Sequence, residues 1–202
     1  MLFPVSLSPG IMPSNPVTVS NVFNISEINK LNNYINTLPY ENARILEGKG
    51  NIEKSKQRRS KIKWLIPNPN LGWLYEKIHQ ISLKANHQWE FDIAGINESI
   101  QYTEYDSQNL DHFGWHLDLG GSIARARKIS ITIQLSNPLE YEGGNLEVFT
   151  GGDYDDPNNR RIAPKEQYSA TIFPSYVLHR VTPVTKGIRK SLVIWVGGIP
   201  FR

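Results

Sequence analysis

Residues 169–196 read SATIFPSYVLHRVTPVTKGIRKSLVIWV, and this stretch decides the fold. It contains three short β-type runs, at 169–173, 177–183 and 191–196, separated by Pro and Gly residues. Similar short runs precede it, at 99–105, 113–117, 128–135 and 145–149. Short strands at this spacing, without helices between them, predict a sandwich or jelly roll rather than alternating strands and helices.

The residues before this region have a helical pattern. Ser26 precedes apolar residues at helical spacing and Pro39 ends that pattern, which predicts an N-capped amphipathic helix. A second helix is predicted over 71–89. We therefore expect an α+β, mainly β protein whose 202 residues form a single domain, with a helical and basic N-terminal part over 1–90 and a jelly-roll core over 91–202.

Composition restricts the function classes. Cysteine is absent, which excludes disulfides, thiolate nucleophiles and cysteine-ligated zinc and leaves His and carboxylates as metal ligands. The N-terminus lacks the basic start of a signal peptide, and no segment approaches the roughly 18 apolar residues of a membrane span. We expect a cytoplasmic protein with no membrane partner.

Basic residues are concentrated between Arg44 and Lys63, where eight stand against two acidic ones, although the net charge is only +3. Such a run can attract a polyanion. No aromatic residue is interleaved with it before Trp64, so a solvated surface loop is favoured and we expect no nucleic-acid partner. The acidic segment 151–161 is predicted to be a solvated loop, and either this loop or the basic segment 44–63 can flank the site entrance and recognise the substrate. The oligomeric state stays open.

His116 and Asp118 are two residues apart in a β-type run, and His179 lies in a second one. Residues i and i+2 of a strand point to the same face, so His116 and Asp118 would approach one ion together. Two histidines and one carboxylate form the facial triad typical of non-haem Fe(II) oxygenases. Taken alone, a core histidine and a turn aspartate explain the pair equally well.

Arg189 favours the metal-binding explanation over the purely structural one. Arg189 and Ser191 share one face of a mainly apolar strand, and a buried guanidinium needs a partner. The planar fork suits the carboxylate of a ligand, and Ser191 adds a hydroxyl donor. Alternatively, the Arg189 guanidinium pairs with a carboxylate of the protein or with solvent.

Several motifs in order resemble the Fe(II)/2-oxoglutarate dioxygenases of the prolyl-4-hydroxylase type, and most closely the PKHD-type hydroxylases. The resemblance extends over residues 58–198. The matching stretches are Tyr105, Gly114-Trp115-His116-Leu117-Asp118, Arg127-Lys128-Ile129-Ser130, Gln134-Leu135-Ser136, Tyr141-Glu142-Gly143-Gly144-Asn145-Leu146, Phe173-Pro174-Ser175, His179-Arg180-Val181-Thr182-Pro183-Val184 and Gly187-Ile188-Arg189.

The resemblance implies a double-stranded β-helix (jelly roll) core with N-terminal supporting helices. It implies Fe(II) held by His116, Asp118 and His179, with O2 and 2-oxoglutarate as co-substrates and ascorbate as reductant. It implies hydroxylation of a C–H bond of a prolyl residue or small molecule, with release of succinate and CO2. The implied 2-oxoglutarate site comprises Arg189 on the C5 carboxylate, with Ser191, Gln134, Tyr105, Leu146 and Trp195 around it.

Three alternatives can be weighed. Iron-dependent halogenases have a small residue in place of the carboxylate ligand, and Asp118 argues against them. Related nucleic-acid demethylases have a second arginine six residues after the anchoring one, where this chain has Trp195. A catalytically silent jelly-roll protein that binds a metal or another ligand is the remaining alternative, and the complete triad with Arg189 disfavours it.

Overall fold

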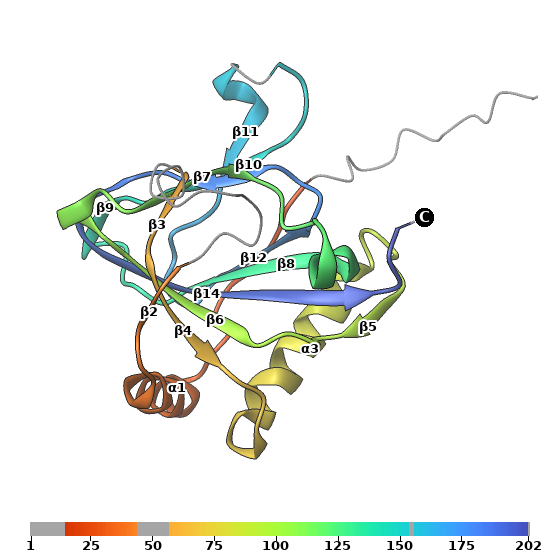
Figure 1. The fold of residues 1–202 in the computed structure, drawn as a ribbon, viewed down its shortest axis with the longest axis horizontal. Helices are drawn as coiled ribbons and strands as arrows, with labels where there is room; N and C mark the ends of the chain where they lie inside the picture. Colours follow the sequence, from red (N-terminus) through yellow and green to blue (C-terminus); the bar gives the residue numbers. More distant parts are fainter. Residues whose placement is uncertain (1–14, 44–56, 154–155, 202) are drawn as a thin grey trace, which may run out of the picture.

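The fold is built from short strands and two longer helices (Figure 1). A computed structural model describes residues 15–43, 57–153 and 156–201. The elements, in chain order, are β1 Val17–Val19, α1 Ile25–Thr37, β2 Glu41–Asn42, β3 Arg58–Arg59, β4 Lys61–Leu65, α3 Gly72–Asn86, β5 Ile93–Gly95, β6 Ile100–Asp106, β7 His112–His116, β8 Arg127–Gln134, β9 Tyr141–Gly143, β10 Leu146–Phe149, β11 Arg160–Ile162, β12 Ala170–Pro174, β13 His179–Val181 and β14 Val184–Gly198.

These strands form two antiparallel sheets. The larger sheet has the order β1-β12-β8-β14-β6-β4-β2, with β5 and β9 also paired to β14. The smaller sheet has the order β11-β10-β13-β7-β3. Figure 1 shows the smaller sheet on one side of the larger one and the helices α1 and α3 on the other. This is the mainly β jelly roll with supporting helices that the sequence predicts.

Strand β8 has one apolar face and one polar face, because apolar and polar residues alternate along it. From Ile129 onward its odd-numbered residues are apolar, fully buried and part of the core beneath the helices: Ile129, Ile131 and Ile133. Its even-numbered residues are polar, buried and on the opposite face: Ser130, Thr132 and Gln134. In a solvated sheet the polar face meets water, whereas here it faces the smaller sheet. A buried polar face of this kind marks the interior where a site can form.

Helix α1 begins two residues earlier than the sequence predicts. The cap is Asn24, whose side chain accepts a hydrogen bond from the Glu27 N–H, while the Glu27 carboxylate accepts one from the Asn24 N–H. This is a complete capping box, so the prediction of Ser26 as the cap is wrong. The predicted stop is confirmed, because the helix ends at Thr37, just before Pro39.

The N-terminal part contributes strands as well as helices. Strands β1 to β4 all precede residue 90 and join both sheets, which the helical pattern of residues 1–90 did not reveal. Most of the basic run, residues 44–56, lies outside the described residues, and the remainder enters β3 and β4. Within the described residues, no helix is both long and apolar enough to cross a membrane.

Candidate active site

The two histidines of the predicted triad form a directly opposed pair in the smaller sheet. His116 ends β7 and lies in register with His179, the first residue of β13, and their rings are 4.1 Å apart between centroids. The Nδ1 atom of each ring contacts the carbonyl oxygen two residues earlier, Gly114 O at 2.8 Å and Val177 O at 2.9 Å. Donation from Nδ1 leaves each Nε2 lone pair free to bind a metal ion.

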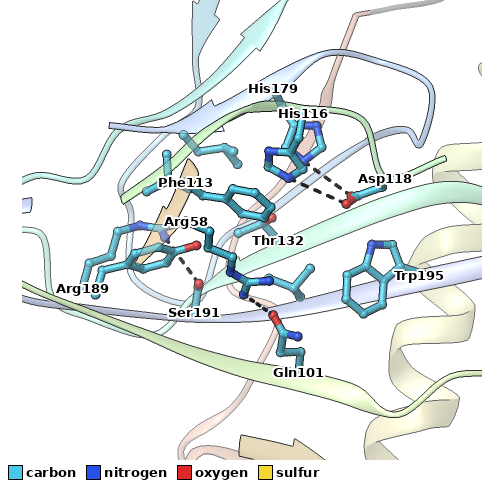
Figure 2. Close-up of a pocket in the computed structure, with 14 residues that line it drawn as sticks. Arg58, Gln101, Phe113, His116, Asp118, Thr132, His179, Arg189, Ser191 and Trp195 are labelled. Atoms are coloured by element: carbon cyan, nitrogen blue, oxygen red, sulfur yellow. Dashed lines mark hydrogen bonds and ion pairs between the residues drawn. The ribbon is translucent and has the colours of Figure 1, made fainter. Parts of the chain in front are cut away.

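Aromatic rings fix the planes of both imidazoles. Phe113 is stacked on His116 with 3.4 Å between ring centroids, and Phe173 lies 4.7 Å from His179. Both histidines are therefore oriented by packing as well as by a hydrogen bond. Such restraint keeps the two Nε2 atoms pointing into the space between the sheets (Figure 2).

Asp118 completes the cluster from the loop after β7, whereas the sequence pattern placed it on a strand. Strand β7 ends at His116, so the prediction that Asp118 points inward because it lies on a strand is wrong. Its position is fixed instead by its N–H, which donates to Ser175 O at 3.0 Å. The carboxylate lies 3.5 Å from His179 Nε2 and 3.8 Å from His116 Nε2. The three ligand atoms all lie within 4.8 Å of one another.

The charges of the cluster suit a divalent ion. Burial, and then the neighbouring His179, lower the pKa of His116 to about 3, so this imidazole is neutral at physiological pH. Burial raises the pKa of Asp118, but His179, His116 and a 2.6 Å hydrogen bond from Ser130 Oγ outweigh that effect and hold it below the ordinary value. A neutral imidazole and an ionised carboxylate are the protonation states that bind metal.

Arg189 lies in the same cavity, on the larger sheet. Its side chain is fully buried, and its Nε and Nη2 atoms have no hydrogen-bond acceptor among the described residues. Nη1 donates a long hydrogen bond to Ser191 Oγ at 3.4 Å. Gly144, at a φ of +57°, lies against this side chain, and a Cβ there would be 2.9 Å from Arg189 Cδ. The Gly-Gly turn therefore leaves room for the arginine.

The other predicted pocket residues have different positions. Tyr105, Leu146 and Trp195 line the cavity, and Tyr105 lies opposite Arg189 in the sheet with its ring 5.4 Å from the guanidinium carbon. Gln134 lies opposite Ser191 and is buried with an unpartnered Oε1, but it is not among the residues that line the cavity. The structure thus brings together every predicted site residue except Gln134, which lies beside the group.

These residues fit an iron ion and a 2-oxo dicarboxylate. Two imidazole nitrogens and one carboxylate oxygen converge from one side, which leaves the other coordination positions of an octahedral ion open. The two unpartnered N–H groups of Arg189 form the fork that a carboxylate accepts in a bidentate manner. A buried guanidinium without an acceptor is costly unless a ligand supplies one.

Sequence reasoning missed four polar residues of this region. Ser130 holds Asp118, and Thr132, Arg58 and Gln101 line the cavity. The polar alternation of β8 between apolar neighbours was a signal for the first two, although a solvated face gives the same pattern. Arg58 gave no separate signal, because it is one of many basic residues in the run that begins at Arg44.

A comparison with models of protein families shows which family the residues of this site resemble. Residues 100–197 match the model of the 2OG-Fe(II) oxygenase superfamily. Nearly half of the chain is therefore similar to that superfamily. The matched residues include the triad, Arg189 and all but one strand of the cavity wall, and they support the family resemblance predicted from the sequence together with its cofactor class, Fe(II) and 2-oxoglutarate.

Similar proteins in the superfamily are PKHD-type hydroxylases. One from Synechococcus sp. (strain CC9605) is 38% identical over 86 residues, which are 43% of this chain and 36% of that protein. Another, from Rippkaea orientalis (strain PCC 8801 / RF-1), is 25% identical over 193 residues, 89% of this chain and 77% of the relative. The chain thus matches about a third of the length of the first relative and most of the second.

Solved structures share the fold. A Pseudomonas putida prolyl-4-hydroxylase superposes with a TM-score of 0.66 at 16% identity, covering 92% of this chain and 93% of that one. A Trichoplax adhaerens prolyl hydroxylase, solved with a hypoxia inducible factor peptide fragment, gives 0.68 at 16% identity, covering 91% and 83%. Similarity at this identity establishes the jelly-roll architecture.

Proposed function

We propose that this chain is an Fe(II)- and 2-oxoglutarate-dependent dioxygenase that hydroxylates a C–H bond and releases succinate and CO2, and that its described residues work as one catalytic domain. One observation carries the proposal. The His116, Asp118 and His179 cluster shares a single cavity with Arg189, whose buried Nε and Nη2 atoms lack an acceptor among the described residues. A metal triad with a carboxylate anchor is what this chemistry requires.

Each residue then has a defined task. His116, Asp118 and His179 would hold Fe(II), which when bound supplies O2 activation and the oxidation of the C–H bond. Arg189 and Ser191 would bind the distal carboxylate of 2-oxoglutarate and so fix its 2-oxo acid end toward the triad. Tyr105, Leu146 and Trp195 would form the wall of that site and exclude water, with Gln134 supporting Ser191. Ascorbate would serve as the external reductant.

The primary substrate would enter from a second, outer chamber. This chamber meets the inner cavity at the triad, since both are lined by Arg58, Gln101, Phe113, His116, Asp118 and Trp195. Its outer walls include Ile62, Trp64, Leu117 and Ile123. We propose a prolyl residue of a peptide or a small molecule as the occupant. The similar hydroxylases favour this class, and the chamber has apolar walls to receive it.

Anaerobic addition of Fe(II) and 2-oxoglutarate tests the proposal. We expect the weak visible charge-transfer band of a 2-oxo acid chelated to iron, and its loss in His116→Ala. The control His79→Ala removes a histidine of α3 and should keep the band. A catalytically silent protein that binds a metal alone would give metal binding without the band, and that result would refute the dioxygenase.

Turnover of 2-oxoglutarate to succinate then identifies the substrate class. The wild-type enzyme is assayed with a proline-rich peptide set and with a small-metabolite set, and succinate is quantified in each case. Stimulation by one set and not the other decides between a prolyl and a small-molecule substrate.

A further inference from the structure

Arg58 is a second arginine in the cavity, and it reaches the site from the other sheet. It lies on β3, which pairs with β7 through the register Arg58–Phe113. Its guanidinium carbon is 4.6 Å from the centroid of the Phe113 ring, and that ring is stacked on His116. Figure 2 shows Phe113 between His116 and the Arg58 side chain. Arg58 therefore lies one aromatic ring away from a metal ligand.

The partners of Arg58 are neutral. Its Nη2 donates to Gln101 Oε1 at 2.7 Å, and its Nε donates to Ser60 Oγ at 3.1 Å. Among the described residues no carboxylate lies within ion-pair distance of it. Burial lowers the pKa of Arg58 below its ordinary value, and the nearby Tyr105 and Asp118 oppose that effect. The folded chain thus holds a poorly solvated cation with hydrogen-bonding capacity left over.

When Fe(II) and 2-oxoglutarate are bound, the positive charge of Arg58 has no negative charge to match it. This charge count rests on the proposed function. The two charges of Fe(II) and the charge of Arg189 are matched by Asp118 and by the two carboxylates of 2-oxoglutarate. Arg127, the other arginine that lines the outer chamber, already forms a two-fold hydrogen-bonded pair with Glu98 at 2.7 and 2.6 Å. Arg58 is the remaining cation beside the triad, and no described carboxylate neutralises it.

We propose that Arg58 binds a carboxylate of the primary substrate, so that the enzyme selects substrates that combine an apolar body with a carboxylate. Arg58 lines both the inner cavity and the outer chamber, so a substrate in the chamber reaches it beside the metal site. The apolar chamber walls would receive the body of the substrate. A single carboxylate is favoured over a phosphate, because Glu41 also lines the chamber and repels a dianion more strongly than a monoanion.

A fluorinated carboxylate tests this without knowledge of the substrate. Trifluoroacetate is titrated by 19F NMR into the protein loaded with Zn(II) and 2-oxoglutarate, with neutral trifluoroacetamide as the matched probe. We expect Arg58→Gln to weaken trifluoroacetate binding by roughly 10- to 100-fold, the usual effect of losing a charge-assisted hydrogen bond, and to leave trifluoroacetamide unchanged. Arg58→Lys, which keeps the charge but loses the planar fork, should fall between wild type and Arg58→Gln.

The neighbouring residue supplies the control. Arg59 is exposed and donates to Asn109 O at 2.8 Å, so Arg59→Gln removes the same charge next to the site and should bind trifluoroacetate like wild type. Equal binding by wild type and Arg58→Gln, or no binding by wild type, overturns the proposal. Near-UV circular dichroism checks that each variant is folded, and Arg58→Lys replaces Arg58→Gln if the latter is not.

Two further outcomes have separate meanings. If Arg58→Gln weakens 2-oxoglutarate binding as strongly as it weakens trifluoroacetate binding, Arg58 serves the co-substrate and the inference is wrong. If wild-type protein with Fe(II) does not bind 2-oxoglutarate at all, the proposed function fails instead. Measurement of 2-oxoglutarate affinity by isothermal titration calorimetry in every variant distinguishes these results.

Discussion

At the scale of single residues, Arg189 is placed for a ligand at a cost to folding. Its side chain is fully buried and two of its nitrogens have no acceptor within the described chain. An unsatisfied buried polar group costs about 1–3 kcal/mol. We expect Arg189→Met to raise the free energy of unfolding of the ligand-free protein by about 1 kcal/mol or more, while the affinity for 2-oxoglutarate falls at least tenfold. Urea denaturation and isothermal titration calorimetry measure the two effects.

Arg127 gives the opposite expectation and serves as the control. Its guanidinium pairs with Glu98 and lies 3.8 Å from the Trp195 ring. Removing one partner of a buried ion pair strands the other, so Arg127→Met should lower the free energy of unfolding by on the order of 3 kcal/mol. A similar loss in Arg189→Met would show that Arg189 is a structural residue and not a ligand anchor.

Ser130 is a residue through which the metal site can be tuned without removal of a ligand. It donates to Asp118 Oδ2 at 2.6 Å and lies 2.9 Å from Ser175 Oγ. Loss of a group that orients a ligand usually costs 10- to 100-fold in metal affinity. We expect Ser130→Ala to weaken Fe(II) or Zn(II) binding by roughly that factor with little change in fold. The control Ser169→Ala alters a buried serine whose hydroxyl contacts Glu166 O, and metal affinity should not change.

The residue types and their order along the chain indicated the candidate metal cluster and Arg189, and the structure places these residues in one cavity. A His-x-Asp pair, a distant histidine and a strand arginine are rare together, so the residue types indicate the chemistry. Arg58 could not be predicted as a site residue, because a sequence pattern does not distinguish one cavity-lining arginine from exposed ones in the same basic run. Asp118 lies in the predicted cluster, but a hydrogen bond to Ser175 positions it there and not a strand. That bond joins residues far apart in the sequence.

At the scale of elements, long patterns were read well and short ones were not. The helices and the strands β6, β8 and β12 lie within a few residues of their predicted bounds, because each has several residues of consistent periodicity. Strands β1 to β5, β9 and β11 were missed, and β11 begins inside the segment 151–161 that was predicted to be a loop. Two of them, β2 and β3, have only two residues each, too few to show an alternation. Pairing with neighbours far away in the sequence creates such strands.

The N-terminus of α1 offers a prediction that separates the cap from its neighbour. Asn24 forms the capping box with Glu27, and Ser26 is exposed in the first turn. Loss of a cap costs typically about 1 kcal/mol, so Asn24→Ala should lower the free energy of unfolding by that amount. Ser26→Ala, at the position that the sequence predicted as the cap, should leave it unchanged. Chemical denaturation of the two variants decides between the two caps.

At the scale of the whole molecule, the site exists only where the two sheets meet. The smaller sheet supplies both histidines, through β7 and β13, and the larger sheet supplies Arg189 through β14. The helices under the larger sheet hold its apolar face, so that its polar face can be turned toward the cavity. Local folding of one segment therefore cannot assemble the site. The burial that comes with the closure of the two sheets also lowers the pKa of His116.

That coupling gives a pH dependence of stability for the metal-free protein. The pKa of His116 falls from its ordinary 6.5 to about 3 in the folded state, with burial as the main cause. Between these values the unfolded chain binds a proton that the folded chain does not. The contribution to stability is therefore complete above about pH 6.5 and is lost progressively as the pH falls toward 3, with a limiting slope of about 1.4 kcal/mol per pH unit.

Denaturation in the presence of a chelator at pH 7, 6 and 5 measures this slope. We expect His116→Asn to reduce the slope of unfolding free energy against pH by up to about 1.4 kcal/mol per pH unit, which corresponds to one proton. The reason is that an amide does not titrate in this range. His79→Asn changes a histidine on α3 and should keep the wild-type slope. An unchanged slope in His116→Asn would mean that His116 is not buried in its neutral form. The two sheets would then be less tightly closed around the metal ligands than the structure places them.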